Sequence, residues 1–369
     1  MGKAMQPNLS RRLFLGGALS GAAGFALSPA ALAALGPARG YIHLNSNENP
    51  YGPSAAALRA AYRASEVGAY YAGSINRELQ EAIAAENGLT TDNMVLSSGS
   101  NEALSAAVVA WGKQGQILAP SLTYDLHMRY AERIGAQIQR VPLAADMSID
   151  LDAMEKAIDR SISMVYVCNP NNPTGMLIDG DELRAFCRRV SKRATVLVDE
   201  AYSELTADPE YSSMISLVRE GENVIIMRTF SKLHGLAGMR VGYGMARPDL
   251  AARVRHHVMA WPNVVGLAAA KASFADHEFR EYSRSKIVDG RKVVTEAFTR
   301  NGIQPLPSET NFVFADIGRD VDEFAERLLE QRIRIHRSYP GYPTFARVSM
   351  GIVEDLHVFA DVFDRLIST

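Results

Sequence analysis

Cysteine is scarce in this chain. The 369 residues include two, Cys168 and Cys187, which are too few for a disulfide framework. Cys168 lies in an apolar run and Cys187 in a helical pattern, so we expect two buried thiols. An excess of charge of one sign is also lacking. The formal net charge of -2 gives no electrostatic reason to expect nucleic acid or an anionic membrane surface as a partner.

Two common kinds of cofactor site are missing as well. The cysteines lie far apart and His256 and His257 are adjacent on an expected helix, so no zinc-ligand spacing occurs and we expect no metal. The spacing of Gly235, Gly238 and Gly242 does not match the dinucleotide-binding fingerprint. The sequence therefore argues against a zinc enzyme and against a nicotinamide enzyme.

The N-terminal segment has an apolar run from Gly16 to Leu27, which is shorter than the roughly 18 to 20 residues that a spanning helix needs. The preceding SRRLFL, residues 10–15, is similar to the twin-arginine export consensus, and Ala31-Leu32-Ala33 resembles a cleavage site. We interpret residues 1–33 as a twin-arginine signal peptide. This predicts a periplasmic protein without stable membrane insertion, or a cytoplasmic one if the signal peptide is not used. The alternative is an uncleaved amphipathic helix.

After Gly40, short β-branched runs alternate with helical patterns. Apolar strands separated by helices imply an α/β fold with a mostly parallel sheet that is covered on both faces. A long helical pattern from Val264 to Arg300, followed by short strands and a closing helix, indicates a smaller α+β domain. The expected strands of the sheet are 94–97, 116–120, 163–168, 195–202 and 223–230.

Polar residues follow these strands, where ligands bind in such sheets. Lys232 follows an apolar strand and precedes Arg240, whose like charge would disfavour the protonated amine and favour nucleophilic or Schiff-base chemistry. Asp199 ends another strand, where a buried carboxylate needs a cationic partner. Gly99-Ser100-Asn101 opens a helix, whose free N–H groups favour a phosphate. Taken alone, Lys232 could equally be an exposed loop lysine.

Three motifs in order, NPNNPTG, VDEAY and TFSKLHGLAGMRVGY, resemble the fold-type I aminotransferases, which depend on pyridoxal phosphate (PLP). The opening LNSNENPYGPS and the closing RVSMG are similar to the histidinol-phosphate aminotransferase-like branch. The resemblance runs from about Tyr41 onward. It implies an N-terminal arm over 34–60 on the small domain, a large PLP-binding domain over 61–263 and a small C-terminal domain over 264–369.

The resemblance also implies a role for single residues. Lys232 would hold PLP covalently and later move a proton, and Asp199 would keep the pyridine nitrogen protonated. Tyr71 would reach the phosphate bound to a neighbouring subunit, which implies a homodimer. The others would act on the ring (Tyr124, Asn172, Tyr202), on the phosphate (Ser100, Asn101, Thr229, Ser231, Arg240) and on the substrate (Arg347, Asn172, Tyr51). Arg347 could instead be a surface arginine at the end of a strand.

The sequence differs from this branch at positions that are expected to lie near the substrate. A Tyr-x-Pro-Gly-like element before the Asn-Glu-Asn-Pro motif is missing, and Trp261-Pro262-Asn263 replaces an expected Pro-Tyr-Asn. His336 stands where relatives often have a phosphate-binding arginine, with Arg334 and Arg337 nearby. The donor therefore stays open between a free amino acid, which we favour and which would be aromatic if Trp261, Tyr124 and Tyr51 lie at the pocket, and a histidinol-phosphate-like donor. A 2-oxo acid such as 2-oxoglutarate is the expected acceptor.

Two alternatives stay open at this point. Another fold-type I PLP enzyme, such as a decarboxylase, β-lyase, racemase or cyclase, would share Lys232 and Asp199. An exported two-lobed solute-binding protein would also be α/β, but it gives no reason for Lys232, Asp199 and Tyr202 to follow consecutive strands.

Overall fold

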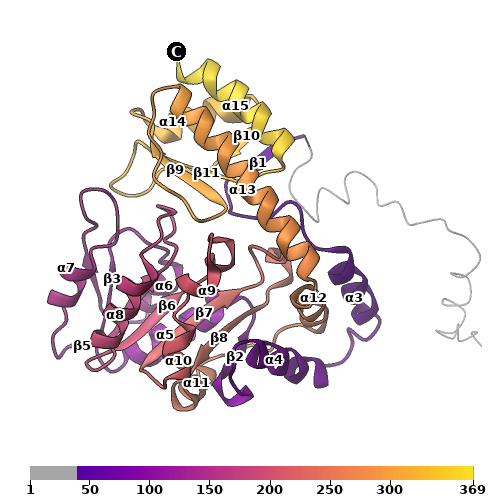
Figure 1. Cartoon of the computed structure of the whole chain (residues 1–369), viewed down its shortest axis with the longest axis vertical. Helices are drawn as coiled ribbons and strands as arrows, with labels where there is room; N and C mark the ends of the chain where they lie inside the picture. The colour runs from indigo at the N-terminus through magenta and orange to yellow at the C-terminus, as the bar shows by residue number, and fades with distance from the viewer. Residues whose placement is uncertain (1–39, 369) are drawn as a thin grey trace, which may run out of the picture. The chain divides into compact units, whose positions relative to one another are not determined.

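A computed structural model describes residues 40–368 (Figure 1). The contacts between residues divide the chain into two units, Met1–Tyr41 and Ile42–Thr369. The second unit holds every helix and strand reported below. The signal peptide predicted over residues 1–33 lies outside the described residues. Within residues 40–368, no helix has the length and hydrophobicity to cross a bilayer.

The main sheet has seven strands in the order β2-β8-β7-β6-β5-β3-β4. Strand β8 runs antiparallel to β2 and β7, and all other neighbours are parallel, so the prediction of a mostly parallel sheet is confirmed. The strands are β2 Met94–Ser97, β3 Gln116–Pro120, β4 Ile138–Val141, β5 Ile162–Cys168, β6 Thr195–Asp199, β7 Val224–Thr229 and β8 Gly242–Ala246. Strands β4 and β8 were not predicted.

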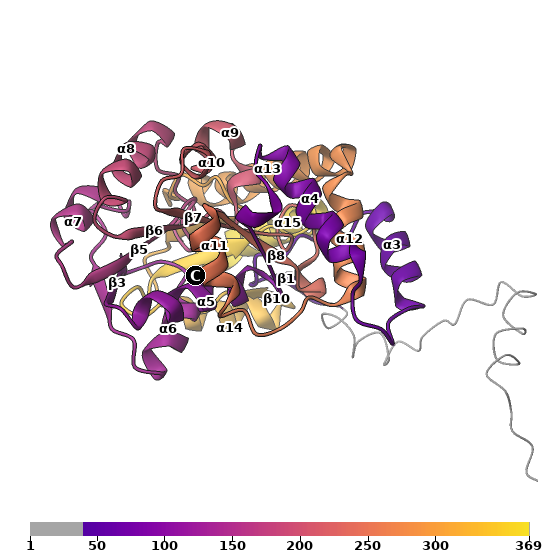
Figure 2. The same ribbon diagram turned by 90° about the horizontal axis from the view of Figure 1, so that it is seen from below.

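Helices cover both faces of this sheet, as Figure 2 shows for α8 and α10 on one side and α5 and α6 on the other. Val165 and Val167 of β5 pack into one core, while Met164 and Tyr166 pack into the other, because successive strand residues point to opposite faces. The first face carries α3 Ala55–Ser65, α4 Ser74–Glu86, α7 Leu151–Lys156, α8 Gly180–Val190, α10 Ile215–Arg219 and α12 Val264–Phe274; the second carries α5 Ser100–Gly112, α6 Leu126–Arg133 and α11 Pro248–Arg255. The short helix α9 spans Pro209–Ser212.

The C-terminal part forms a core of its own around two small sheets. Strands β9 and β11 pair antiparallel, and β10 pairs parallel with the early strand β1, Ile42–Leu44. Residues 42–44 therefore pair with this part of the chain, and the N-terminal arm over 34–60 stays a prediction. The elements are α13 His277–Arg300, β9 Phe312–Asp316, α14 Val321–Glu330, β10 Ile333–Ile335, β11 Phe345–Ser349 and α15 Val353–Ile367.

The single helical pattern predicted from Val264 to Arg300 is wrong. It forms two helices, α12 and α13, because Asp276 caps the second by accepting a hydrogen bond from the backbone N–H of Phe279 at 3.1 Å. Helix α12 shares the core of the main sheet, whereas α13 packs in the C-terminal core. The predicted domain boundaries stay predictions.

The strand ends of the main sheet are aligned. The register places Cys168 of β5 beside Asp199 of β6, and Asp199 beside Met227 of β7. Thr229 at the end of β7 lies beside Gly242, which begins the antiparallel β8. The residues that follow β5, β6 and β7 therefore meet at one edge of the sheet.

Candidate active site

A cavity of about 830 Å³ opens at this edge of the sheet. Its lining includes eleven of the predicted site residues: Ser100, Asn101, Tyr124, Asn172, Asp199, Tyr202, Thr229, Ser231, Lys232, Arg240 and Arg347. They come from five loops of the main sheet and from β11 of the C-terminal part. The structure thus brings together residues that are up to 247 positions apart (347 − 100) in the sequence.

Lys232 lies in the turn after β7, and its Nζ donates a hydrogen bond to the carbonyl oxygen of Asn47 at 3.0 Å. Burial, followed by the nearby Arg347 guanidinium, lowers the pKa of the Lys232 amine to about 8. Part of the amine is therefore neutral near physiological pH and carries the lone pair that a nucleophile or a base requires.

Asp199 ends β6 and is 2% exposed. Its Oδ2 accepts a hydrogen bond from Tyr166 Oη at 3.1 Å, and its Oδ1 accepts one from the N–H of Ala201 at 3.2 Å. Burial raises the pKa of this carboxyl to about 6. No basic side chain within residues 40–368 forms an ion pair with it, so a bound cation such as a protonated pyridine would compensate the buried charge.

A hydrogen-bonded group at the cavity consists of Tyr202, Asn172 and Asn47. The hydroxyl of Tyr202 accepts hydrogen bonds from Asn47 Nδ2 at 3.1 Å and from Asn172 Nδ2 at 3.4 Å. Burial raises the pKa of Tyr202, so the hydroxyl keeps its proton and can donate it to an anionic oxygen.

The opening of α5 and the β7–β8 connection form a cradle for an anion. Gly99 has φ 81°, and a Cβ there would collide with the Arg240 guanidinium; a Cβ at Gly242 would collide with the backbone of Ser100. Both glycines are therefore required for the close approach of these segments. Thr229 and Ser231 join the cradle through a hydrogen bond of 2.9 Å between their hydroxyl oxygens. Free N–H groups at a helix start, two hydroxyls and a guanidinium suit a phosphate.

Tyr124 is held at the cavity by a hydrogen bond of 3.3 Å from its hydroxyl to Asn101 Oδ1. Behind it, its ring centroid lies 5.9 Å from that of the fully buried His127, which in turn lies 4.7 Å from Tyr166. Burial lowers the pKa of His127 to about 3, so this imidazole stays neutral and acts as packing. The arrangement leaves the Tyr124 ring in place to stack on a bound planar group.

Arg347 is buried on β11 and faces the cavity. Its Nη1 donates to Asn172 Oδ1 at 3.0 Å and its Nη2 to the carbonyl oxygen of Asn45 at 2.8 Å. Its Nε has no hydrogen-bond partner among the described residues. A buried guanidinium with a free donor is suited to a carboxylate, so the alternative of a surface arginine is wrong.

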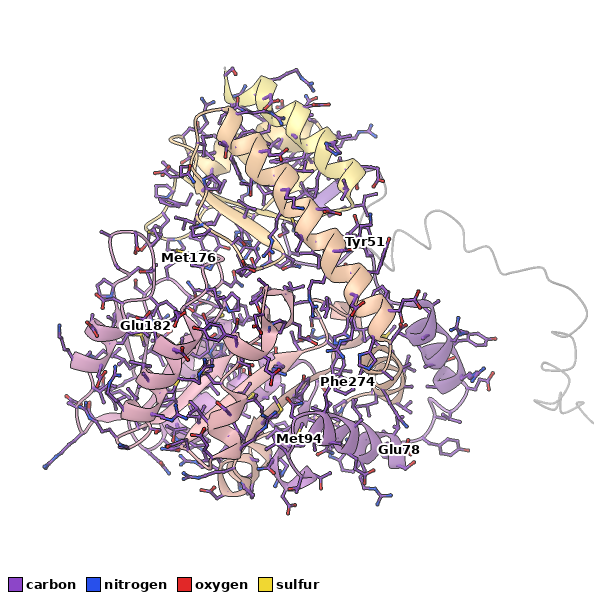
Figure 3. All side chains as sticks on the ribbon, in the orientation of Figure 1. Tyr51, Glu78, Met94, Met176, Glu182 and Phe274 are labelled. Carbon is purple, nitrogen blue, oxygen red and sulfur yellow. The ribbon has the colours of Figure 1, made fainter. Side chains whose placement is uncertain are left out.

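Three predicted residues lie away from this cavity in the described chain. Tyr51 accepts a hydrogen bond from the N–H of Val353 at 2.9 Å and packs edge-on against Tyr282, beside α13 (Figure 3). The prediction that Tyr51 and Trp261 line the pocket is therefore not supported within one chain. Tyr71 is 87% exposed and contacts Trp261, with ring centroids 5.5 Å apart.

Asn47 is a site residue that was not predicted from the sequence. Besides its bonds to Lys232 and Tyr202, its backbone N–H donates to Ser349 Oγ at 3.0 Å, and its carbonyl oxygen accepts from Asn311 Nδ2 at 2.9 Å. It has φ 53°, a left-handed conformation that asparagine tolerates. The only sequence signal for Asn47 is its place in the motif LNSNENPYGPS. This motif indicates the family, but it does not indicate that Asn47 contacts Lys232 or Tyr202.

These residues fit PLP. The cradle matches its phosphate, Asp199 its pyridine nitrogen, Tyr202 and Asn172 its ring oxygen, and Lys232 its aldehyde. When bound, PLP supplies an aldehyde carbon that exchanges amines and a protonated ring that withdraws electrons. The roles of the single residues stay predictions.

The lowered pKa of Lys232 predicts the pH dependence of PLP capture by the apoprotein. Only the neutral amine can attack the aldehyde, so the capture rate should rise with pH through a midpoint near 8 rather than near the ordinary lysine value of 10.5. The measurement is the growth of visible absorbance after PLP is mixed with apoprotein at a series of pH values. Arg347→Met removes a neighbouring positive charge and should move the midpoint upward; a wild-type midpoint near 10.5 would contradict the assignment.

Comparisons with known proteins agree with this geometry. The family described as aminotransferase class I and II matches residues 39–363. A histidinol-phosphate aminotransferase of Brevibacillus brevis is 34% identical over 330 residues, which cover 89% of this chain and 90% of that protein. Histidinol-phosphate aminotransferase 1 of Nitrosococcus oceani is 35% identical, with the same two coverages.

A solved structure shows the same fold with the cofactor. The histidinol-phosphate aminotransferase from Sinorhizobium meliloti, in complex with pyridoxal-5'-phosphate, has a TM-score of 0.79 and 27% identity, covering 93% of this chain and 95% of that chain. The match of the family to nearly the whole described chain, around a cavity that fits PLP, leads to one conclusion: the protein belongs to the class I and II aminotransferases and is a PLP-dependent aminotransferase.

Proposed function

We propose that the enzyme moves the amino group of a free amino acid to a 2-oxo acid such as 2-oxoglutarate. The observation that carries the proposal is the buried Arg347 with its free Nε beside Asn172. Free amino acids and 2-oxo acids both have a carboxylate next to the reacting carbon, and one guanidinium can hold each of them in turn.

Four residues of this chain have separate roles in the proposed reaction. Arg347 orients the substrate carboxylate, which places the amino group toward Lys232. Lys232 Nζ, with its pKa lowered to about 8, takes a proton from the substrate's α-carbon and returns it to the cofactor side. Asp199, held by Tyr166 and Ala201, stabilises a positive charge opposite its carboxylate. Tyr202 holds the proton that it donates to the ring oxygen.

A histidinol-phosphate-like donor is the second candidate, and the names of the relatives favour it. Histidinol phosphate has a phosphate ester in the place of the carboxylate, and a guanidinium fork binds either anion, so Arg347 could hold this donor as well. A direct comparison of the two donors therefore has to decide between them.

The half-reaction without acceptor tests the proposal. At least one free amino acid should convert bound PLP to pyridoxamine phosphate and release its 2-oxo acid, with a kcat/KM about tenfold or more above that of histidinol phosphate. Arg347→Lys keeps the charge but loses the fork, so it should lower kcat/KM for amino acids about 100-fold. The readouts are the visible absorbance of the cofactor and the 2-oxo acid formed.

Two results would count against this proposal. Histidinol phosphate far ahead of every free amino acid would overturn the donor assignment. Release of carbon dioxide or ammonia while the cofactor stays as PLP would point to a decarboxylase or a lyase instead.

We propose further that the enzyme is a homodimer in which Tyr71 reaches the PLP phosphate bound to the neighbouring subunit. Tyr70, Tyr71, Met259 and Trp261 are each more than 70% exposed, and they line one groove. Four large side chains exposed together are typical of an interaction surface. Tyr71 lies outside the catalytic cavity of its own chain, so its predicted role requires a second subunit.

Mixing two inactive variants tests the shared site. Tyr71→Ala and Lys232→Ala should each be nearly inactive alone. A heterodimer contains one site with Lys232 and with the partner subunit's Tyr71, so the mixture should regain activity after the subunits exchange. Tyr62→Ala, at an exposed position outside this groove, is the matched control and should keep activity without mixing. A mixture that stays inactive, although heterodimers form, would rule out the shared site.

We propose that the mature enzyme is exported to the periplasm through the twin-arginine signal peptide over residues 1–33. Support comes from SRRLFL and from Ala31-Leu32-Ala33. The assembled nature of the site is a second argument, because residues from many loops must meet before PLP binds. Twin-arginine export is associated with folded cargo, which suits a cofactor-loaded enzyme.

Fractionation of cells tests the export proposal. Arg11→Lys with Arg12→Lys keeps the charge of the signal peptide but changes the twin arginines, so activity should move from the periplasm to the cytoplasm. Arg133→Lys with Arg160→Lys makes the same chemical change at two exposed positions and should leave the distribution unchanged. Periplasmic activity that is unaffected by the change at Arg11 and Arg12 would refute the route.

A further inference from the structure

The turns that follow β6 and β7 carry Tyr202 and Lys232, and the backbone pairing of the two strands ends before either turn. Among the described residues, the last backbone hydrogen bond between them runs from the N–H of Glu200 to the carbonyl oxygen of Met227 at 2.8 Å. Beyond it, the Lys232 amine lies 5.4 Å from the centroid of the Tyr202 ring. The placement of these two groups relative to each other therefore depends on side chains that join the two turns.

His234 is a buried side chain that joins them. It lies two residues after Lys232, and its Nε2 is 3.4 Å from Oε1 of Glu204, which lies two residues after Tyr202. On the other side of the ring, Nδ1 lies 2.9 Å from Ser273 Oγ on α12. The imidazole thus connects the turn after β7 with the turn after β6 and with a helix of the main-sheet core.

Glu204 is a carboxylate that is itself held in place. Burial raises the pKa of Glu204, but the neighbouring His234 and then Arg280 outweigh this effect and lower the pKa to about 2. Arg280 Nη2 lies 3.5 Å from Glu204 Oε1, and Arg284 Nε donates to the Glu204 carbonyl oxygen at 2.8 Å. Both arginines belong to α13, so His234 faces a carboxylate that is fixed to this helix.

Burial alone does not give a histidine such partners in this protein. His127 is fully buried, yet neither of its ring nitrogens has a hydrogen-bond partner within residues 40–368. His234 instead has a polar atom of a different element beside each ring nitrogen. Because hydrogen bonds and ion pairs of this kind are directional, they restrict the orientation of the His234 ring more narrowly than apolar packing does.

The turn that carries Lys232 passes this restraint on to the amine. The N–H of Gly235 donates to the carbonyl oxygen of Lys232 at 3.1 Å, and the N–H of Leu236 donates to the carbonyl oxygen of Phe230 at 3.0 Å. Gly235 has φ 65°, which keeps the turn tight. Since the turn is closed by its own hydrogen bonds, a shift of His234 moves the backbone of Lys232 with it.

We infer that His234 is a positioning residue, which fixes the place of the Lys232 amine by joining its turn to Glu204 and Ser273. His234 does not line the catalytic cavity, so it acts through Lys232 and not on a bound molecule. The inference rests on the role proposed for Lys232 as nucleophile and base. A displacement of about 1 Å in such a group can lower a rate about 100-fold.

Two forms of the cofactor separate an effect on Lys232 from an effect on the rest of the site. PLP reacts with Lys232, whereas pyridoxamine phosphate has an amine in place of the aldehyde and binds through its phosphate and ring alone. His234→Phe keeps a flat ring and loses both polar contacts. In the apoprotein of this variant, we expect capture of PLP to slow about tenfold or more, while the Kd for pyridoxamine phosphate stays within about twofold. The readouts are visible absorbance and calorimetric titration.

The half-reaction of the PLP-loaded enzyme with L-glutamate, the amino acid formed from 2-oxoglutarate, gives a second readout. His234→Phe should lower the maximal rate about tenfold or more and change the half-saturating concentration less than about threefold, because Arg347 is untouched. His234→Gln keeps a group that can donate toward Glu204 and should lie between the wild type and His234→Phe. Glu204→Gln should have a much smaller effect in the His234→Phe background than in the wild type, because the two residues act together.

Trp111→Phe is the matched control for loss of stability. It also removes a buried hydrogen bond of a ring nitrogen, from Trp111 Nε1 to Thr195 Oγ1 at 2.7 Å, in the core on the other face of the sheet. This variant should lower the temperature of unfolding but leave the capture of PLP and the kinetics with L-glutamate unchanged.

The inference is overturned if His234→Phe captures PLP as fast as Trp111→Phe does. It is also overturned if the Kd of His234→Phe for pyridoxamine phosphate rises as much as its capture of PLP slows, because the whole site would then be disturbed. The capture and binding measurements need no amino acid, so they hold even if L-glutamate is not a donor. A wrong role for Lys232 itself would be seen separately, as normal capture of PLP by Lys232→Ala.

Discussion

The buried carboxylate of Asp199 is the constraint around which the site is arranged. A carboxylate at 2% exposure, supported by two neutral hydrogen-bond donors, is unfavourable unless a positive charge stands opposite it. Strand β6 lies in the middle of the sheet, which helps to bury the Asp199 carboxylate. The alignment of β6 with β5 and β7 brings the residues that follow these strands to the same edge of the sheet. A protonated pyridine would satisfy Asp199, and Asp199 would in turn keep that pyridine protonated.

A second constraint is that the short segment around Asn47 contacts both the main-sheet part and the C-terminal part of the chain. Asn47 contacts Lys232 and Tyr202 from the main sheet side, and Asn311 and Ser349 from the C-terminal part. Strand β1, just before it, pairs with β10. Movement of one core relative to the other would therefore alter the position of the carbonyl that holds Lys232 Nζ. This segment couples the substrate side of the cavity to the catalytic amine.

Much of this could be predicted from the sequence, for identifiable reasons. The strands ending at Cys168, Asp199 and Thr229 are apolar runs with abrupt polar ends, so both the sheet and its functional edge were predictable. Strand β8 was not predictable, because its sequence GYGMA has two glycines in five residues and follows a turn. The break between α12 and α13 was missed because a single cap, Asp276, interrupts a continuous helical pattern. Asn47 depends on long-range packing that no local pattern contains. Tyr51 shows that a motif residue can serve a helix terminus instead of the cavity.

The central claim is that Lys232, with its environment of Asp199, Arg347 and Asn47, is the amine that holds PLP. Borohydride reduction of the PLP-loaded protein, followed by mass spectrometry of its peptides, tests this directly. We expect the cofactor to be fixed to the peptide containing Lys232 in the wild type and in Lys192→Ala, which changes an exposed lysine after α8, and to no peptide in Lys232→Ala. Fixation that persists at another lysine with full activity in Lys232→Ala would contradict it.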